Sequence, residues 1–96
     1  MIVHTVWFQL KDGISAEEKA HLKAQMEGMR SQISQIVELH CGEDFCGRSR
    51  GFGWGLIVKF RTREDGQLYD QHPDHQAFIA RCKPLWTDVM ALDFEV

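Results

Sequence analysis

The chain has 96 residues, of which 44% are hydrophobic and 26% are charged, and its formal net charge at pH 7 is −3. This size and mix predict one globular domain over residues 1–96. The negative charge argues against a nucleic-acid partner, because phosphate neutralisation requires a basic face. No apolar run reaches the roughly 18 residues that a membrane span needs. The first residues lack the pattern of a signal peptide, so a cytoplasmic location is expected.

The first two elements are a strand and a helix. Residues 2–11 are rich in β-branched and aromatic side chains that alternate with a period of two, which predicts a strand. His4 and Phe8 lie on its more apolar face. Ser15 then begins a capping box, and apolar residues follow it at helical spacing. A helix is therefore predicted over residues 15–32.

The middle of the chain predicts two further strands separated by a loop. Residues 35–41 suggest a second strand, and residues 42–51 are glycine-rich and charged, which is typical of a loop. Residues 52–61 alternate again, with Trp54 on the apolar face. The glycines here lack the Lys-Ser/Thr pair of a phosphate-binding loop and lead into a strand, so they predict close packing against another layer.

The most distinctive segment is residues 68–78, which holds the only tyrosine and a His-Pro-Asp-His sequence. A capping signature upstream predicts a helix that ends before Pro73, because proline lacks an N–H group and pushes His72 out of the α region. Asp74 is predicted to cap a second helical piece. His75 then lies in the first turn of that piece.

The predicted order of elements is β-α-β-β-α-β, because the second helical piece ends near Pro84 and residues 87–96 alternate as a final strand. This is an α+β fold of the ferredoxin-like kind, a four-stranded antiparallel sheet with helices on one face. The other sheet face is predicted to be apolar, which favours a homodimer packed sheet on sheet. The residues expected on that face are Val3, Trp7, Ile57 and Val89.

The histidines near the helix break predict acid–base chemistry. A helix N-terminus disfavours an imidazolium, so it lowers the pKa of His75 and leaves a neutral imidazole that can act as a general base. A structural interpretation stays open, in which Pro73 makes a kink and the histidines are polar filler. A metal site built from His72, Asp74 and His75 is a third interpretation. Because neighbouring residues at a helix start point apart, no metal site is predicted.

Taken together, these segments resemble the stress-responsive A/B barrel domain (Dabb) family, and the resemblance covers essentially the whole chain. The family implies a ferredoxin-like subunit, two of which form a dimeric α/β barrel. Its name describes conditions of expression and implies no reaction. The matching features are His4 in the opening strand, the run Tyr69-x-x-His72-Pro73-x-His75-x-x-Phe78, and the final strand around Leu92-Asp93-Phe94.

The resemblance extends to plant olivetolic acid cyclase, which closes a linear polyketide by aldol condensation. It implies active-site groups at His4, Tyr69 and His75. Trp54 aligns with a further pocket histidine of that cyclase. Because an indole cannot accept a proton, the pocket of this chain is expected to be smaller and differently shaped.

The residues and the resemblance agree on an apolar pocket beneath the helices that takes a small organic ligand. In a cofactor-free cyclase or lyase, His75 would abstract a proton next to a carbonyl, and Tyr69 or His4 would hydrogen-bond the enolate oxygen. Two alternatives stay open: a binding or stability protein without chemistry, and a haem-degrading or oxygen-using monooxygenase that shares the fold. Four further residues are expected to line the pocket: Phe8, Trp54, His72 and Phe78.

Overall fold

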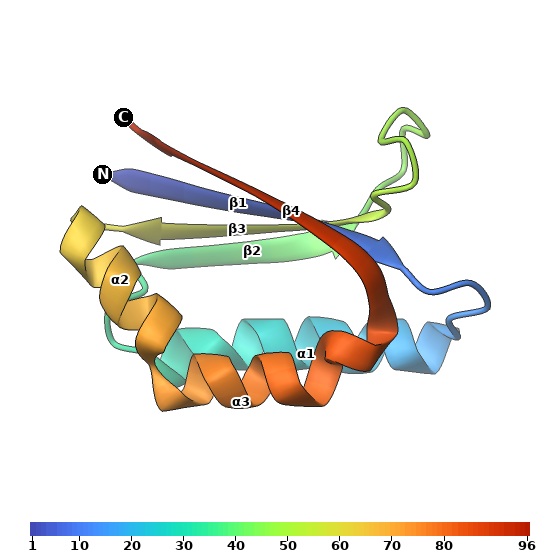
Figure 1. Cartoon of the computed structure of the whole chain (residues 1–96), viewed down its shortest axis with the longest axis horizontal. Coiled ribbons are helices and arrows are strands. Elements are labelled where there is room, and N and C mark those ends of the chain that lie inside the picture. The colour runs from blue at the N-terminus through green and yellow to red at the C-terminus, as the bar shows by residue number, and fades with distance from the viewer.

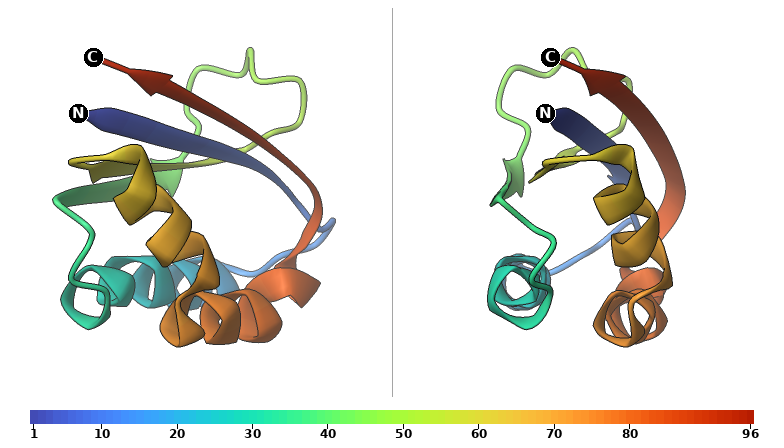
Figure 2. Two further views of the ribbon diagram at one scale, coloured as in Figure 1. Left: turned by 60° about the vertical axis from the view of Figure 1, so that its left-hand side comes forward. Right: turned by 90° about the vertical axis from the view of Figure 1, so that its left-hand side faces the viewer.

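The computed structural model describes residues 1–96 as one sheet covered on one face by helices (Figures 1 and 2). Its strands pair antiparallel in the order β2-β3-β1-β4. This confirms the ferredoxin-like α+β fold, with the second helical region divided into two. The elements are β1 (Ile2–Leu10), α1 (Ala16–Gln32), β2 (Glu38–Glu43), β3 (Trp54–Phe60), α2 (Arg63–Gln71), α3 (Pro73–Cys82), a short 3-10 helix (Lys83–Leu85) and β4 (Trp86–Glu95).

The first helix begins where the capping box predicts. The Ser15 hydroxyl accepts a hydrogen bond from the Glu18 amide at 3.0 Å, and the Ser15 amide donates to the Glu18 carboxylate at 3.1 Å. The apolar stripe of α1 packs against the sheet and is inaccessible to solvent, which confirms it as core. Its residues are Leu22, Met26, Met29 and the C-cap residue Ile33.

The second strand begins later than the prediction of residues 35–41. Ile33 and Ile36 are both buried, but they belong to a turn in which the Ile36 amide donates to the Ile33 carbonyl at 3.2 Å. These two apolar side chains therefore pack at the end of the hydrophobic core and are not part of a strand. The ladder starts at Glu38 and continues to Glu43, which lies opposite Trp54.

The outer sheet face, the one turned away from the helices, is apolar along β1 and β4. Trp7 is on this face and is 49% exposed. Val89 was expected there as well, but this is wrong: it lies opposite Phe8 and faces the helices. In a directly opposed antiparallel pair both side chains share a face, so the pairing with Phe8 places Val89 on the helix side. The exposed apolar residues of β4 on the outer face are Met90, Leu92 and Phe94.

A β-bulge at the start of β4 turns one large aromatic side chain towards the helices. Gln9 pairs with Asp88 and Leu10 pairs with Trp86, so Thr87 is left without a partner in the ladder. The extra residue shifts the alternation by one. Trp86 consequently lies on the helix side, with its ring centroid 4.8 Å from that of Phe8. Residue-by-residue alternation along β4 would have placed it on the outer face.

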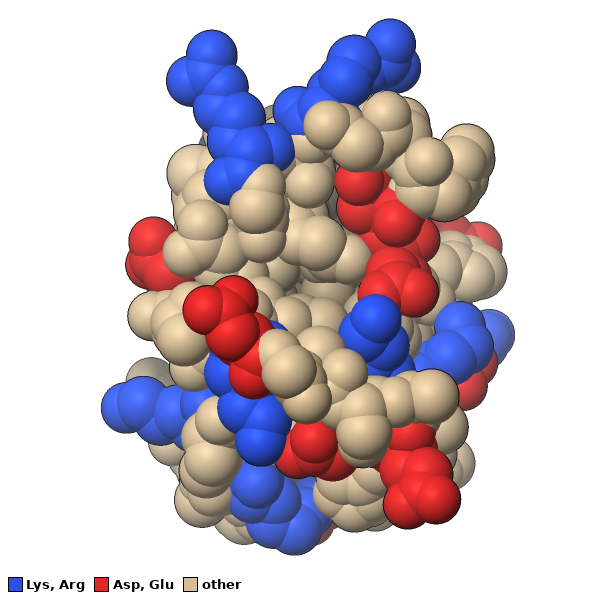
Figure 3. Space-filling view, turned by 90° about the vertical axis from the view of Figure 1, so that its right-hand side faces the viewer, with Lys and Arg blue, Asp and Glu red and all other residues tan.

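Charges of both signs are interspersed over the face shown in Figure 3. Several form ion pairs, such as Lys11 with Glu18 at 2.8 Å and Lys59 with Glu38 at 3.0 Å. None of the helices has the length and apolar character needed to cross a bilayer. The cytoplasmic location stays a prediction.

Candidate functional site

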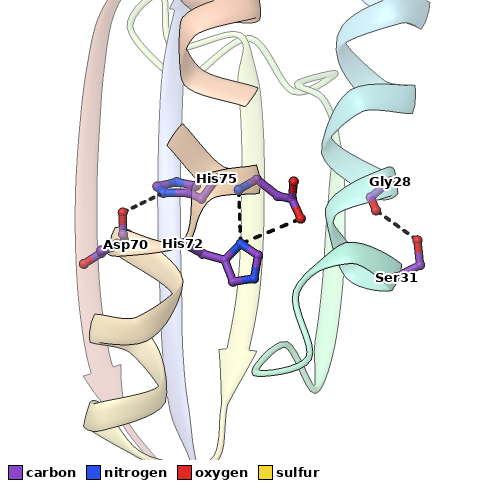
Figure 4. A network of polar contacts seen from close by, with 6 residues as sticks. Gly28, Ser31, Asp70, His72 and His75 are labelled. Atoms are coloured by element: carbon purple, nitrogen blue, oxygen red, sulfur yellow. Dashed lines mark hydrogen bonds and ion pairs between the residues drawn. The ribbon is translucent and has the colours of Figure 1, made fainter. Parts of the chain in front are cut away.

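The helix break is organised by His72, which ends α2 and caps α3. Its backbone is extended, with φ −63° and ψ 134°, as expected for a residue before proline. Its Nδ1 atom accepts a hydrogen bond from the Asp74 amide at 3.1 Å (Figure 4). The prediction that Asp74 caps α3 is therefore wrong. Pro73 occupies the first helical position, where its missing N–H group costs nothing, and this places His72 at the cap.

His75 points to the opposite side of the helix start from His72 (Figure 4). Its Nδ1 atom lies 3.2 Å from the carbonyl oxygen of Asp70. A carbonyl only accepts, so Nδ1 carries the proton and Nε2 keeps its lone pair in the neutral ring. Burial is the main cause that lowers the pKa of His75. The predicted direction of the pKa shift is confirmed, but its leading cause is desolvation.

The ring of Tyr69 lies close to both His75 and His4. Its ring centroid is 4.2 Å from that of His75 and 5.8 Å from that of His4, in an edge-on arrangement with His4. The side chain is almost completely buried, and this burial raises its pKa, so the hydroxyl keeps its proton at neutral pH. None of the side-chain hydrogen bonds within the chain involves this hydroxyl. It remains available to donate to a ligand.

His4 is held by Asp93, a residue that the sequence did not single out. Nδ1 of His4 and Oδ1 of Asp93 are 2.5 Å apart, across the β1–β4 ladder. Asp93 accepts the Nδ1 proton of His4, which leaves Nε2 as the atom that meets a ligand. Asp93 belongs to the final strand that the sequence predicts, but its contact with His4 depends on the register with β1. Nothing local in the sequence specifies that register.

A cavity of about 260 Å³ lies between the helices and the β1–β4 side of the sheet. It brings together His4, Tyr69 and His75, the three residues predicted to be catalytic, with Phe8 and Phe78 from the predicted lining. The sequence missed further lining residues, which come from the bulged strand, the centre of the sheet and the end of α3. They include Leu56, Lys83, Trp86 and Val89.

Two residues expected in the lining lie elsewhere. Trp54 is buried on the α1 side of the core, where its indole N–H donates to the sulfur of Met26 at 3.2 Å. It does not border the cavity, so it leaves that space open. His72 caps α3 and points away from His75. The tryptophan that lines the cavity beneath the helices is Trp86 and not Trp54.

A second, more polar hollow of about 410 Å³ lies on the other side of His4. Asp70, Asp93 and Arg63 border it, and His4 is the only residue that borders both hollows. The Asp93 side chain is 60% exposed there, whereas that of His4 is 15% exposed. The His4–Asp93 pair thus connects the apolar cavity with a water-accessible surface.

The side chains of His72, Asp74 and His75 are not arranged as a three-residue metal site. His72 and His75 point apart, and Nδ1 of His72 is engaged by the Asp74 amide. No group of three or more His, Cys, Asp or Glu side chains is arranged to hold a metal ion.

We expect acid to destabilise the protein through His75. Its pKa lies below the ordinary value of 6.5 in the folded state and returns to it on unfolding. The unfolded state therefore binds more protons at His75: the contribution of this residue to stability is fully present above about pH 6.5 and is lost as the pH falls through the folded-state pKa. Urea unfolding at several pH values should show a flatter profile for His75→Gln than for the wild type. The same change at His21, an exposed residue of α1, should leave the profile unaltered, and identical wild-type and His75→Gln profiles would contradict the prediction.

Comparison with known proteins gives two sequence relationships that cover nearly all of this chain. A Streptomyces coelicolor protein, named as uncharacterised, is 31% identical over 98 residues, covering 99% of both chains. The stress-response A/B barrel domain-containing protein DABB1 of Arabidopsis thaliana is 24% identical over 99 residues. That match covers 98% of this chain and 46% of DABB1, so the chain spans about half the length of this relative.

Solved structures share the fold. The Arabidopsis thaliana protein At3g17210 superposes with a TM-score of 0.92 at 21% identity, covering 100% of this chain and 95% of that one. A Thermobifida fusca protein, described as dimeric and ferredoxin-like, has a TM-score of 0.86 at 19% identity, with 99% and 90% covered. The profile of the stress responsive A/B barrel domain matches residues 2–96. The chain therefore belongs to the stress-responsive A/B barrel domain family.

Proposed function

We propose that the protein is a homodimer whose subunits each bind a small organic compound in the cavity bordered by His4, Tyr69 and His75. The observation that carries this proposal is the lining itself: mostly apolar side chains with three polar groups converging at one end. This is the usual composition of a small-molecule site, and the volume of about 260 Å³ suits a small ligand.

The homodimer is supported by the outer sheet face. Trp7 and Leu92 leave large apolar surfaces in contact with water, at 49% and 61% exposure. Contiguous apolar surface of this kind marks an interface. A second copy is the proposed occupant, because the Thermobifida fusca protein with the same fold is described as dimeric. Packing sheet on sheet leaves the cavities, which lie on the helix side, open to ligands.

A second candidate function is proton abstraction next to a carbonyl group. It is supported by one proton acceptor and one hydrogen-bond donor that border the same cavity. In the neutral state Nε2 of His75 has a free lone pair and can take a proton from carbon. The Tyr69 hydroxyl can donate to the enolate oxygen that forms. When Nε2 of His4 is also protonated, Asp93 balances the imidazolium, and His4 becomes a second donor.

One experiment tests both functions with phenylacetone, a compact ketone with an acidic CH₂ group, in D₂O. Amide chemical shifts should move for residues of the cavity, which reports binding. The CH₂ signal should disappear faster than in buffer as deuterium replaces the protons. We expect His75→Ala to slow this protein-dependent exchange about a hundredfold. Tyr69→Phe should slow it while leaving the fold intact.

The control for this experiment is His21→Ala, which removes an exposed imidazole on α1 and should leave the exchange rate unchanged. Shifts at the cavity without any exchange above buffer would contradict proton abstraction and retain the binding function. Absence of shifts at the cavity would overturn the ligand proposal.

A further inference from the structure

Lys83 differs from every other lysine of the chain because it has no partner. The ammonium groups of Lys11, Lys19 and Lys59 pair with carboxylates, and that of Lys23 donates to the Cys41 carbonyl at 2.8 Å. Lys83 makes no ion pair and no side-chain hydrogen bond within the chain. It lies where α3 ends and borders the cavity. A free ammonium beside an apolar cavity is a site for an anionic group.

The electrostatics of the lining agree with this assignment. The lining contains one ammonium and two imidazoles but no carboxylate. An anion entering from the Lys83 end therefore meets no like charge along the wall. The aromatic ring of Trp86 lies at this end, next to Phe8, and supplies apolar surface for the part of the ligand that follows the anion.

The two ends of the cavity are well separated. Along α3, Lys83 lies two turns beyond His75, about 12 Å at the helical rise. Along β1, Phe8 lies about 13 Å from His4 at the strand rise. The free Nε2 atoms and the Tyr69 hydroxyl are thus at one end, and Lys83, an exposed residue, borders the other.

We propose that the cavity selects elongated, apolar monoanions, such as carboxylates, whose charge is bound by Lys83 and whose opposite end reaches Tyr69 and His75. This inference rests on the proposed ligand-binding function, and it adds the substrate class and the residue that recognises it. A ligand of this class with a carbonyl group at its far end would place the acidic carbon beside His75.

The test compares hexanoate, hexanamide and hexylamine, which share an alkyl chain and differ in head-group charge. Each is titrated at neutral pH into the full-length protein, and the dissociation constant is taken from the amide shifts of cavity residues. Because Lys83 is exposed, we expect the upper end of the range for an exposed ion pair: hexanoate should bind about fivefold more tightly than hexanamide, and hexylamine should bind most weakly. In Lys83→Gln the preference for hexanoate over hexanamide should vanish while the affinity for hexanamide is unchanged.

The matched control is Lys23→Gln, which removes the same charge from α1, outside the cavity lining, and should keep the fivefold preference. Equal binding of hexanoate and hexanamide to the wild type would overturn anion recognition while leaving the ligand-binding function in place. A preference that survives in Lys83→Gln would overturn the role of Lys83. If all three compounds and phenylacetone leave the cavity shifts unchanged, both this inference and the proposed function fail.

Discussion

Leu92→Asp is expected to convert the proposed homodimer into monomers. Leu92 is the most exposed of the large apolar side chains on the outer sheet face, at 61%, and it lies opposite Thr5 at the middle of the β1–β4 ladder. In a two-fold interface the substitution introduces two carboxylates, and each must be desolvated without a partner, which costs several kcal/mol. Light scattering coupled to gel filtration should report a molar mass that falls from two chains to one.

The control for this change is Leu68→Asp. Leu68 is 51% exposed, but it lies on α2, away from the outer sheet face. Its substitution adds the same charge at a similar degree of exposure and should leave the dimer intact. A Leu92→Asp protein that keeps the mass of two chains would show that another surface forms the interface. A dimer lost in the Leu68 variant would point to the helix side.

Tyr69→Ala is expected to lower the free energy of unfolding by about 3–5 kcal/mol, as is usual when a buried aromatic side chain is truncated. The ring fills the space between Phe60, at a centroid distance of 5.0 Å, and His75. Tyr69→Phe should change stability by less than about 1 kcal/mol, because the hydroxyl has no partner to lose within the chain. Urea unfolding of both variants and the wild type measures the difference.

Phe45→Ala is the control for this comparison, since the Phe45 side chain is 100% exposed and its truncation should be nearly neutral. A large loss in Tyr69→Phe would mean that the hydroxyl is part of the fold, and it could not then be reserved for a ligand. A small loss in Tyr69→Ala would mean that the neighbouring rings close over the space.

Local periodicity was sufficient for most of the fold. The alternation of β1 correctly places His4 and Phe8 on the helix side, and the proline rule correctly predicts the break that aims His75 into the cavity. These features depend on side chains only a few positions apart. The alternation also identifies Trp7 as exposed on the other face.

The rest of the site depends on pairing between distant strands. Asp93 reaches His4 only because β4 lies beside β1 in one particular register. The same register turns Val89 towards the helices. Trp54 shows a different limit of sequence-based prediction. Its strand and its face of the sheet are as predicted, but the helix that covers it is α1. Its indole N–H therefore donates to Met26 and not to a ligand. The local sequence determines which face of the sheet a side chain occupies, but it does not determine which distant element packs against that side chain.

The unpaired Thr87 gives the protein a way to change ligand size without altering any helix. If the bulge closed without loss of a residue, Thr87 would pair with Leu10, Trp86 would turn to the opposite side of β4, and the cavity would lose one of its aromatic walls. This one-residue change of register would alter the pocket volume in a single step and leave the acid–base groups at the far end in place. Relatives that keep the length of β4 but pair without the bulge should therefore differ in the bulk of the molecules they accept.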